Sequence, residues 1–145
     1  ICGREDGAPP PVDLAAERRN GDFVRRLIES RAVTAVHDVS DGGLAVALAD
    51  MAMAGGIGVS IEVSPPLPEL GFLFGEDQAR YIVATVPENA EAIRDRAETA
   101  GVVCEIIGVT GQGTLTLGSG AAILLNELVR VHEGWLPGYM DGADP

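Results

Sequence analysis

The chain has 145 residues, of which 46% are hydrophobic, 22% charged and 4% aromatic, and its formal net charge is −12. This length suits one domain with a hydrophobic core, and the apolar fraction is too high for a disordered chain. The acidic balance excludes a typical nucleic-acid-binding protein, because binding to a phosphate backbone needs a basic face. We therefore expect no nucleic-acid partner.

All ten basic residues are arginines. Without lysine, the chain cannot supply a Walker A lysine, a pyridoxal-phosphate Schiff base or a lysine general base. The two cysteines, Cys2 and Cys104, are isolated in the sequence, which is typical of proteins in a reducing compartment. The sequence shows no secretion signal and no apolar stretch long enough to span a bilayer. We expect a cytoplasmic protein with no membrane partner.

The first half of the chain predicts a helix, a strand and a second helix. Residues 1–11 are proline-rich and are expected to be a linker or the end of an upstream segment, with one domain over residues 12–145. Apolar spacing predicts a helix over residues 13–31, although Asn20 and Gly21 could interrupt it. A β-branched run predicts a strand over residues 32–37. After a polar turn, a helix begins near Leu44 and ends at Gly55-Gly56.

The second half predicts mostly strands. Residues 79–86 are nearly continuous in apolar residues, which is typical of a strand buried on both faces. Pro87 begins a helix that Gly101 ends. Turn residues at 110–113 predict a β-hairpin between strands 102–109 and 114–117. The other predicted elements are a strand at 57–63, a loop at 64–68, a short strand at 121–125 and a helix from about Asn126 toward Pro137. These elements predict an α/β (α+β) sandwich with a mixed β-sheet and packed helices.

The densest polar cluster follows the first predicted strand. Asp38 and Asp41 offer the carboxylate oxygens that Mg²⁺ prefers, and Gly42 and Gly43 allow a ligand to approach the backbone closely. A nucleotide phosphate at this point would need a bridging cation, because the two aspartates repel it. The alternative is structural: Ser40 or Asp41 caps the following helix, and the glycines permit the turn. His37, next to this cluster, is either an acid–base group or a satisfied polar residue near the core.

A second polar cluster, Glu76, Asp77, Gln78 and Arg80, precedes the apolar strand. Such side chains can bind hydroxyls, amines or a metal-bridged phosphate. The alternative is a solvated strand entrance with a local ion pair. Because Asp38 follows a strand and Glu76 precedes one, neighbouring antiparallel strands would bring both clusters to the same end of a sheet. Otherwise each cluster faces solvent separately.

These motifs resemble a known family when they are taken together. Residues 35–49 (AVHDVSDGGLAVALA) and residues 73–81 (LFGEDQARY) resemble the C-terminal part of the phosphoribosylformylglycinamidine synthase family, synthetase subunit. Residues 20–25 (NGDFVR) and 132–137 (HEGWLP) are similar to the same family. The resemblance covers almost the whole chain in the right order. It implies the fold of the C-terminal domain of aminoimidazole ribonucleotide synthetase, to which that family is related.

The resemblance implies a domain of an ATP-dependent carbon–nitrogen ligase of purine biosynthesis. Such enzymes convert formylglycinamide ribonucleotide, ATP and glutamine-derived ammonia to formylglycinamidine ribonucleotide, ADP and phosphate. The implied cofactors are ATP or ADP and Mg²⁺. The implied partners are upstream domains of the same synthetase, a glutaminase and a small accessory subunit. The chain would be the last of four domains, and alone it is expected to be inactive.

The implied site residues are carried over position by position. Asp38 matches the metal ligand of the family's first-half Asp-x-Gly-x-x-Gly-Leu turn, with Ser40 in place of a glycine and Asp41 as an extra acid. Glu76 and Gln78 match a substrate-contacting Glu-Ser-Gln motif, in which Asp77 replaces serine. Because the family's second site is similar to a structural nucleotide site, the implied role is an auxiliary one, with no catalytic residue. The implied nucleotide- or substrate-binding positions are Asp41, Gly42, Gly43, Glu76, Asp77, Gln78 and Arg80.

Two alternatives to this interpretation are a purely structural domain and another superfamily member. The first would bury its sheet against partner domains without chemistry of its own. The second would be a hydrogenase maturation protein or a selenophosphate or thiamine-phosphate enzyme, which we do not expect to share the Trp135-Leu136-Pro137 tail.

Overall fold

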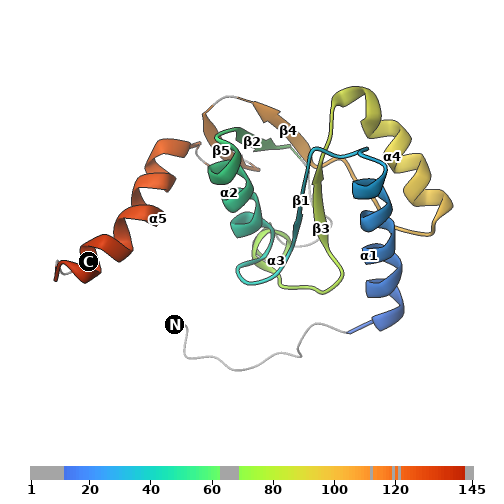
Figure 1. Cartoon of the computed structure of the whole chain (residues 1–145), viewed down its shortest axis with the longest axis horizontal. Coiled ribbons are helices and arrows are strands. Elements are labelled where there is room, and N and C mark those ends of the chain that lie inside the picture. Colours follow the sequence, from blue (N-terminus) through green and yellow to red (C-terminus); the bar gives the residue numbers. More distant parts are fainter. Residues whose placement is uncertain (1–11, 63–68, 112, 119, 121, 143–145) are drawn as a thin grey trace. The chain divides into compact units, whose positions relative to one another are not determined.

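The computed structural model describes residues 12–62, 69–111, 113–118, 120 and 122–142. The predicted linker at 1–11 and loop at 64–68 lie outside these residues. Two compact units are present, one drawing on residues up to 41 and on 76–103, the other on 42–75 and on 104 onward. The elements, labelled in Figure 1, are α1 (Leu14–Glu29), β1 (Ala35–Asp38), α2 (Gly43–Gly55), β2 (Gly58–Ile61), α3 (Glu69–Phe74), β3 (Tyr81–Ala84), α4 (Pro87–Thr99), β4 (Gly108–Gly111), β5 (Thr114–Leu117), β6 (Ile123–Leu124) and α5 (Leu125–Met140).

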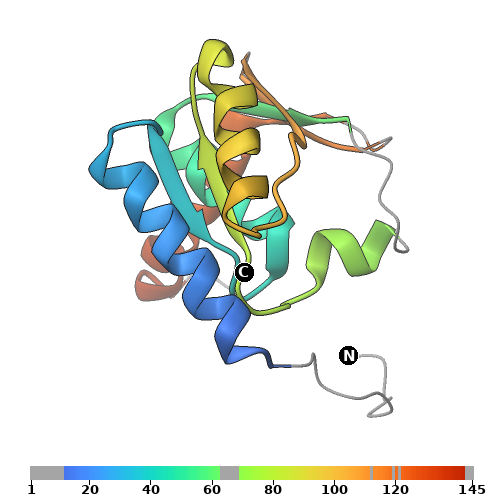
Figure 2. The same cartoon turned by 90° about the vertical axis from the view of Figure 1, so that its right-hand side faces the viewer.

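The first unit is a two-stranded antiparallel ribbon with two helices. β1 pairs with β3 so that Ala35 lies opposite Ala84 and Asp38 opposite Tyr81. Helices α1 and α4 lie on the same face of this ribbon in both views (Figures 1 and 2). The buried side chains of the unit come from both helices, from β3 and from the residue that follows β1. They are Phe23, Val24, Leu27, Val39, Ile82, Ile93 and Ala97.

Helix α1 runs through Asn20 and Gly21 without a break, and Figure 2 shows it as one continuous helix. A glycine in a helix interior costs about 1 kcal/mol relative to alanine, so packing must compensate for it. The start of β1 differs from the prediction by three residues. Ala32 is still bound to the end of α1, because its amide donates to the Leu27 carbonyl at 3.0 Å. The chain is therefore available for strand pairing only after this point.

The predicted burial of β3 on both faces is wrong. Only Ile82 of this strand is buried, and Tyr81 is exposed. Within its unit, β3 has a single strand neighbour, and the helices lie on one face of the ribbon. An apolar run alone does not distinguish this arrangement from a central strand covered on both faces.

The second unit contains a four-stranded mixed sheet in the order β4-β2-β5-β6. β2 pairs antiparallel with β4 and parallel with β5. The sheet is mixed, as predicted, but the predicted hairpin between β4 and β5 is wrong, because β2 lies between them. The link from Gly111 to Thr114 is long enough to connect two strands that are separated by a third. Its three Cα–Cα steps reach about 11 Å, and two inter-strand spacings add up to roughly 9.6 Å.

Helix α2 contacts this sheet and the helices α3 and α5. Six of its 13 residues are buried, and its C-cap is Gly56, which adopts the left-handed conformation that favours glycine. Helix α3 was not predicted, because its six residues are too few to show helical periodicity. Helix α5 continues past Pro137 to Met140, further than predicted. Among the described residues, no helix has both the length and the apolar character needed to cross a membrane.

Candidate functional site

The end of β1 and the beginning of β3 bring the first unit's polar residues to one end of the ribbon. Asp38 is the last residue of β1 and lies opposite Tyr81, the first residue of β3. Beyond the paired residues, the Val39 amide donates to the Arg80 carbonyl at 2.9 Å. The antiparallel pairing required for a shared end is therefore present, and it places Asp38 beside the turn that carries the second cluster.

The side chains at this end are accessible. The Asp38 side chain is 68% exposed, and its Oδ1 lies 3.7 Å from Nδ1 of His37. That ring nitrogen also lies 2.5 Å from the Asp38 carbonyl oxygen. Asp77 and Arg80 form an ion pair at 3.6 Å, with 48% and 26% of their side chains exposed. The local ion pair expected of a solvated strand entrance is thus present, and it leaves the carboxylates reachable from solvent.

The turn before β3 is tied to helix α1. Asn20 donates from Nδ2 to the Ala79 carbonyl at 3.0 Å. Ala79 has a φ of +64°, which is unusual for a residue other than glycine. From the sequence, Asn20 stood out as a residue that could interrupt the helix and as part of the family-like segment 20–25, but not as a site residue. The available signal was the pair of weak helix formers, Asn20 and Gly21, in an otherwise regular helical pattern.

Gly42 and Gly43 belong to the second unit, where they begin helix α2. Their φ angles are +78° and +70°. The alternative that Ser40 or Asp41 caps this helix is wrong: the N-cap is Gly42, and no side chain caps the helix. A Cβ on Gly43 would lie 2.7 Å from the carbonyl carbon of Phe74. Glycine is thus required here by backbone packing as well as by φ.

The fit of the site to Mg²⁺ depends on what else supplies ligands. Within the described ranges, no group of three His, Cys, Asp or Glu side chains is arranged to hold a metal ion. Mg²⁺ is commonly bound through one or two carboxylates together with nucleotide phosphates and water. The exposed carboxylate of Asp38 fits an ion shared with a nucleotide, and it does not fit a metal site built by this chain's side chains alone.

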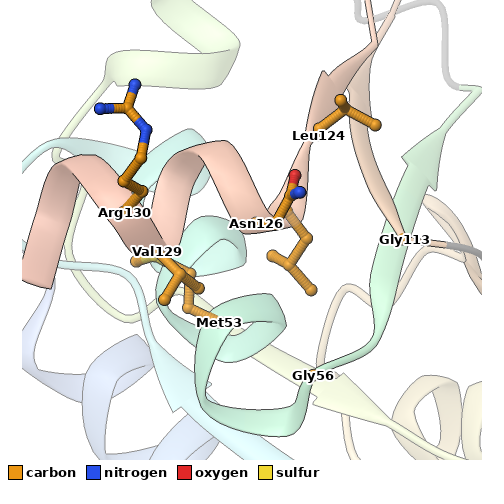
Figure 3. Close-up of a pocket in the computed structure, with 8 residues that line it drawn as sticks. Met53, Gly56, Gly113, Leu124, Asn126, Val129 and Arg130 are labelled. Atoms are coloured by element: carbon orange, nitrogen blue, oxygen red, sulfur yellow. The ribbon is translucent and has the colours of Figure 1, made fainter.

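Among the described residues, two of the cavities lie away from the polar edge. One, of about 590 Å³, lies in the second unit between the end of α2 and the start of α5. Figure 3 shows Val129 beside Met53 in this cavity, while the Arg130 guanidinium extends away. The other, of about 310 Å³, lies between α1 and α4 and is lined by residues including Phe23, Arg26 and Arg96. The predicted site residues line neither of these two cavities.

Most of the chain matches a known protein family. Residues 2–118 match the family described as AIR synthase related protein, C-terminal domain. The chain belongs to this family. The match covers both polar clusters and every strand from β1 to β5, so the resemblance noted from the sequence motifs is confirmed.

Curated relatives of this family member are subunits of one enzyme. The chain is 63% identical over 143 residues to the phosphoribosylformylglycinamidine synthase subunit PurL of Methylocella silvestris, an alignment that covers 99% of the chain and 20% of the relative. It is 57% identical to the subunit of the same name from Parvibaculum lavamentivorans, covering 97% of the chain and 19% of the relative. The chain thus spans about a fifth of the length of these relatives.

Solved structures show the same fold at low sequence identity. PurL of Thermotoga maritima complexed with FGAR superposes with a TM-score of 0.73 at 17% identity, covering 88% of this chain and 23% of that one. The same protein complexed with ADP gives a TM-score of 0.70 at 18% identity, covering 81% and 22%. The α/β fold predicted from the sequence is therefore confirmed.

Proposed function

We propose that this chain is the C-terminal domain of a PurL-type synthetase. The whole enzyme would be an ATP-dependent ligase that forms formylglycinamidine ribonucleotide from formylglycinamide ribonucleotide and glutamine-derived ammonia. The observation that carries the proposal is 63% identity to a named PurL subunit over nearly the entire chain. In this proposal, residues 1–11 link the domain to upstream domains, and residues 12–145 form the domain itself. The same relatives favour the synthase over a hydrogenase maturation, selenophosphate or thiamine-phosphate enzyme.

The proposed role of the polar edge is to hold a nucleotide with Mg²⁺ at an auxiliary site. Asp38 would be the metal ligand, because it is exposed at the end of β1 and adjoins the second cluster. Glu76, Asp77, Gln78 and Arg80 would contact the nucleotide or substrate from the same end of the ribbon. Asp41, Gly42 and Gly43 stay proposed binding positions on the strength of the family motif alone. When bound, Mg²⁺ would offset the negative charge that these carboxylates and a phosphate share.

The proposed partners are other parts of the same enzyme complex. They are the upstream domains of the synthetase, a glutaminase that supplies ammonia and a small accessory subunit. A solved T. maritima assembly named PurLQS, whose fold match has a TM-score of 0.71, supports complex formation in this class of protein. The proposal includes a cytoplasmic location, which fits a sequence with only two cysteines.

A chimera tests the enzymatic proposal. The matching fifth of the M. silvestris relative is replaced by this chain, and ATP-dependent formation of the amidine product from formylglycinamide ribonucleotide and ammonia is measured. We expect the chimera to retain activity and the 145-residue chain alone to have none, since it lacks the remaining domains. A folded, inactive chimera would contradict the proposal. Activity of the chain alone would contradict the need for upstream domains.

The site role is tested in the same chimera with Asp38→Asn. We expect this substitution to weaken binding of ADP in the presence of Mg²⁺, measured by calorimetric titration. The matched control is Asp95→Asn, which removes one exposed carboxylate from α4 in the same unit. Equal affinities for both variants would exclude Asp38 as a metal ligand while leaving the domain's place in the enzyme intact.

A further inference from the structure

The contact between Asn20 and Ala79 joins two distant parts of the first unit. Asn20 lies in the middle of α1, and its Nδ2 donates to the Ala79 carbonyl at 3.0 Å across 59 positions of sequence. Gly21, the next residue, lies close to β3, because a Cβ on it would be 3.3 Å from the Tyr81 hydroxyl. Two consecutive α1 residues therefore face the turn before β3 and the first residue of that strand.

Each residue of this contact has a residue type or a backbone conformation that is unfavourable at its position. Asparagine and glycine are weak helix formers, yet both stand inside α1. Ala79 adopts a positive φ, a conformation that favours glycine. Oδ1 of Asn20 is buried and accepts no hydrogen bond from the described residues. Several locally unfavourable features at one contact are typical of a functional site.

The contact fixes the backbone that carries the second polar cluster. Two hydrogen bonds hold the turn. The Asn20 side chain donates to the Ala79 carbonyl, and the Val39 amide donates to the Arg80 carbonyl. Residues 76–78 come immediately before these two anchored carbonyls. We propose that Asn20 is a positioning residue, which holds the 76–80 turn in the conformation that presents Glu76, Asp77 and Gln78 to a ligand. The ligand-binding part of this inference rests on the proposed function.

The test replaces the amide with a carboxylate of almost the same size. In Asn20→Asp at neutral pH, the donor is lost and a negative charge faces the Ala79 carbonyl. We expect the backbone amide resonances of Gln78, Ala79 and Arg80 to move in a ¹H–¹⁵N spectrum of the 145-residue chain. Asn89→Asp is the matched control, because it makes the same chemical change at an exposed position of α4 in the same unit. It should leave these resonances unchanged.

Lowering the pH of the Asn20→Asp variant distinguishes a lost hydrogen bond from lost packing, because only the hydrogen bond can be restored by protonation. Once protonated, the carboxyl introduced by Asn20→Asp can donate to the Ala79 carbonyl again, and burial beside a carbonyl raises the pKa of that carboxyl. The turn resonances of Asn20→Asp should therefore return toward wild-type positions as the pH falls through that raised pKa. The ionisable groups of the turn and of the paired strand end, Glu76, Asp77, Arg80, Tyr81 and Asp38, are all retained in the Asn89→Asp control, which therefore reports their own titration.

Ligand affinity is measured separately, in the chimera described above. We expect Asn20→Asp to reduce affinity for ADP with Mg²⁺ by about tenfold, the usual size of a supporting-residue effect at such sites. Moved resonances with unchanged affinity would overturn the ligand-presenting role. Unmoved resonances would overturn the positioning role itself. If even the unsubstituted chimera binds no ADP, the proposed function fails, and the spectra still decide whether Asn20 holds the turn.

Discussion

Helices α1 and α2 begin in opposite ways. The carboxylate of Asp13 caps α1, where Oδ1 accepts hydrogen bonds from the amides of Ala15 and Ala16 at 2.9 and 3.0 Å. Helix α2 begins on Gly42 with no side-chain cap and has no acidic residue in its first turn. The difference continues along the helices: α1 buries three of its 16 residues and exposes its arginines, whereas α2 buries six of its 13.

This contrast indicates where the stability of each helix originates. The start of α1 is stabilised by local hydrogen bonding and by its charged surface. The start of α2 is stabilised by packing, because Gly43 lies against the backbone of Phe74 and Gly75. A helix held mainly by packing leaves its first turn without a carboxylate of its own. Asp41 lies directly before the N-cap, so a phosphate near this helix start would still need a bridging cation.

The largest expected effect is on the packed helix. Leu48 is 3% exposed, so Leu48→Ala should lower the free energy of unfolding by about 2–5 kcal/mol. Asp41→Ala, just before the same helix, should change it by less than about 0.5 kcal/mol, because Asp41 is exposed and caps nothing. Urea unfolding of both variants measures the difference. Comparable losses would mean that α2 depends on a local cap after all.

The second effect concerns the beginning of α2. Gly43→Ala adds a methyl group against the backbone of Phe74 at a positive φ, and we expect a loss of about 1–3 kcal/mol. Gly55→Ala is the control, because nothing lies within 4 Å of its added Cβ and its φ is not positive. That variant should be neutral or stabilising by up to about 1 kcal/mol. Thermal melting that ranks the two variants the other way would contradict the close packing of α2 and α3.

A smaller effect is expected at the cap of α1, and it depends on pH. The backbone amides of Ala16 and Ala15 lower the pKa of the Asp13 carboxyl below its ordinary value. A group whose pKa is lowered by folding stabilises the fold above its unfolded pKa and ceases to do so as the pH falls through the folded one. Asp13→Ala should therefore be less stable than wild type at neutral pH. The difference in unfolding free energy between the two proteins should disappear below about pH 3.9, the ordinary aspartate pKa. Urea unfolding at a series of pH values from neutral to acidic measures it.

The smallest effect belongs to the exposed face of α1. Arg25 and Asp22 form an ion pair at 2.9 Å one turn apart. Arg25→Ala should cost no more than about 0.5 kcal/mol, and most of this should vanish in high salt. Unfolding in low and high salt checks the prediction. A larger, salt-independent loss would indicate that the arginine stem packs against the core.

The four long helices could be predicted from the sequence, whereas the short α3 and the order of the strands could not. The spacing of Phe23, Val24 and Leu27, or the Pro87 start of α4, reports local structure that the structure confirms. The hairpin failed because the turn residues after Thr110 show that the chain reverses, but not that β2 lies between the two strands. The cap of α2 failed for a similar reason. Ser40 and Asp41 have suitable side chains, yet packing at Gly43 sets where the helix begins.

The candidate site was only partly accessible from the sequence. The positions of Asp38 and Glu76 relative to their strands predicted a shared end, and the pairing of β1 with β3 provides it. The roles of the proposed site residues stay predictions. Asn20 was missed because its contact is to a carbonyl 59 positions away, and no local pattern indicates a long-range hydrogen bond.

The interleaving of the two units sets the order in which this chain can fold. The ribbon of the first unit closes only when residues 81–84 meet residues 35–38, after the whole of α2 and α3 has been synthesised. The sheet of the second unit waits longer, because β2 needs partners that lie about fifty residues further along. Pairings between distant segments lose loop entropy before any contact forms, and they slow folding. Apolar α2 is therefore synthesised before β5 and must remain without its complete sheet until β5 follows, which leaves its apolar residues open to misassociation during synthesis.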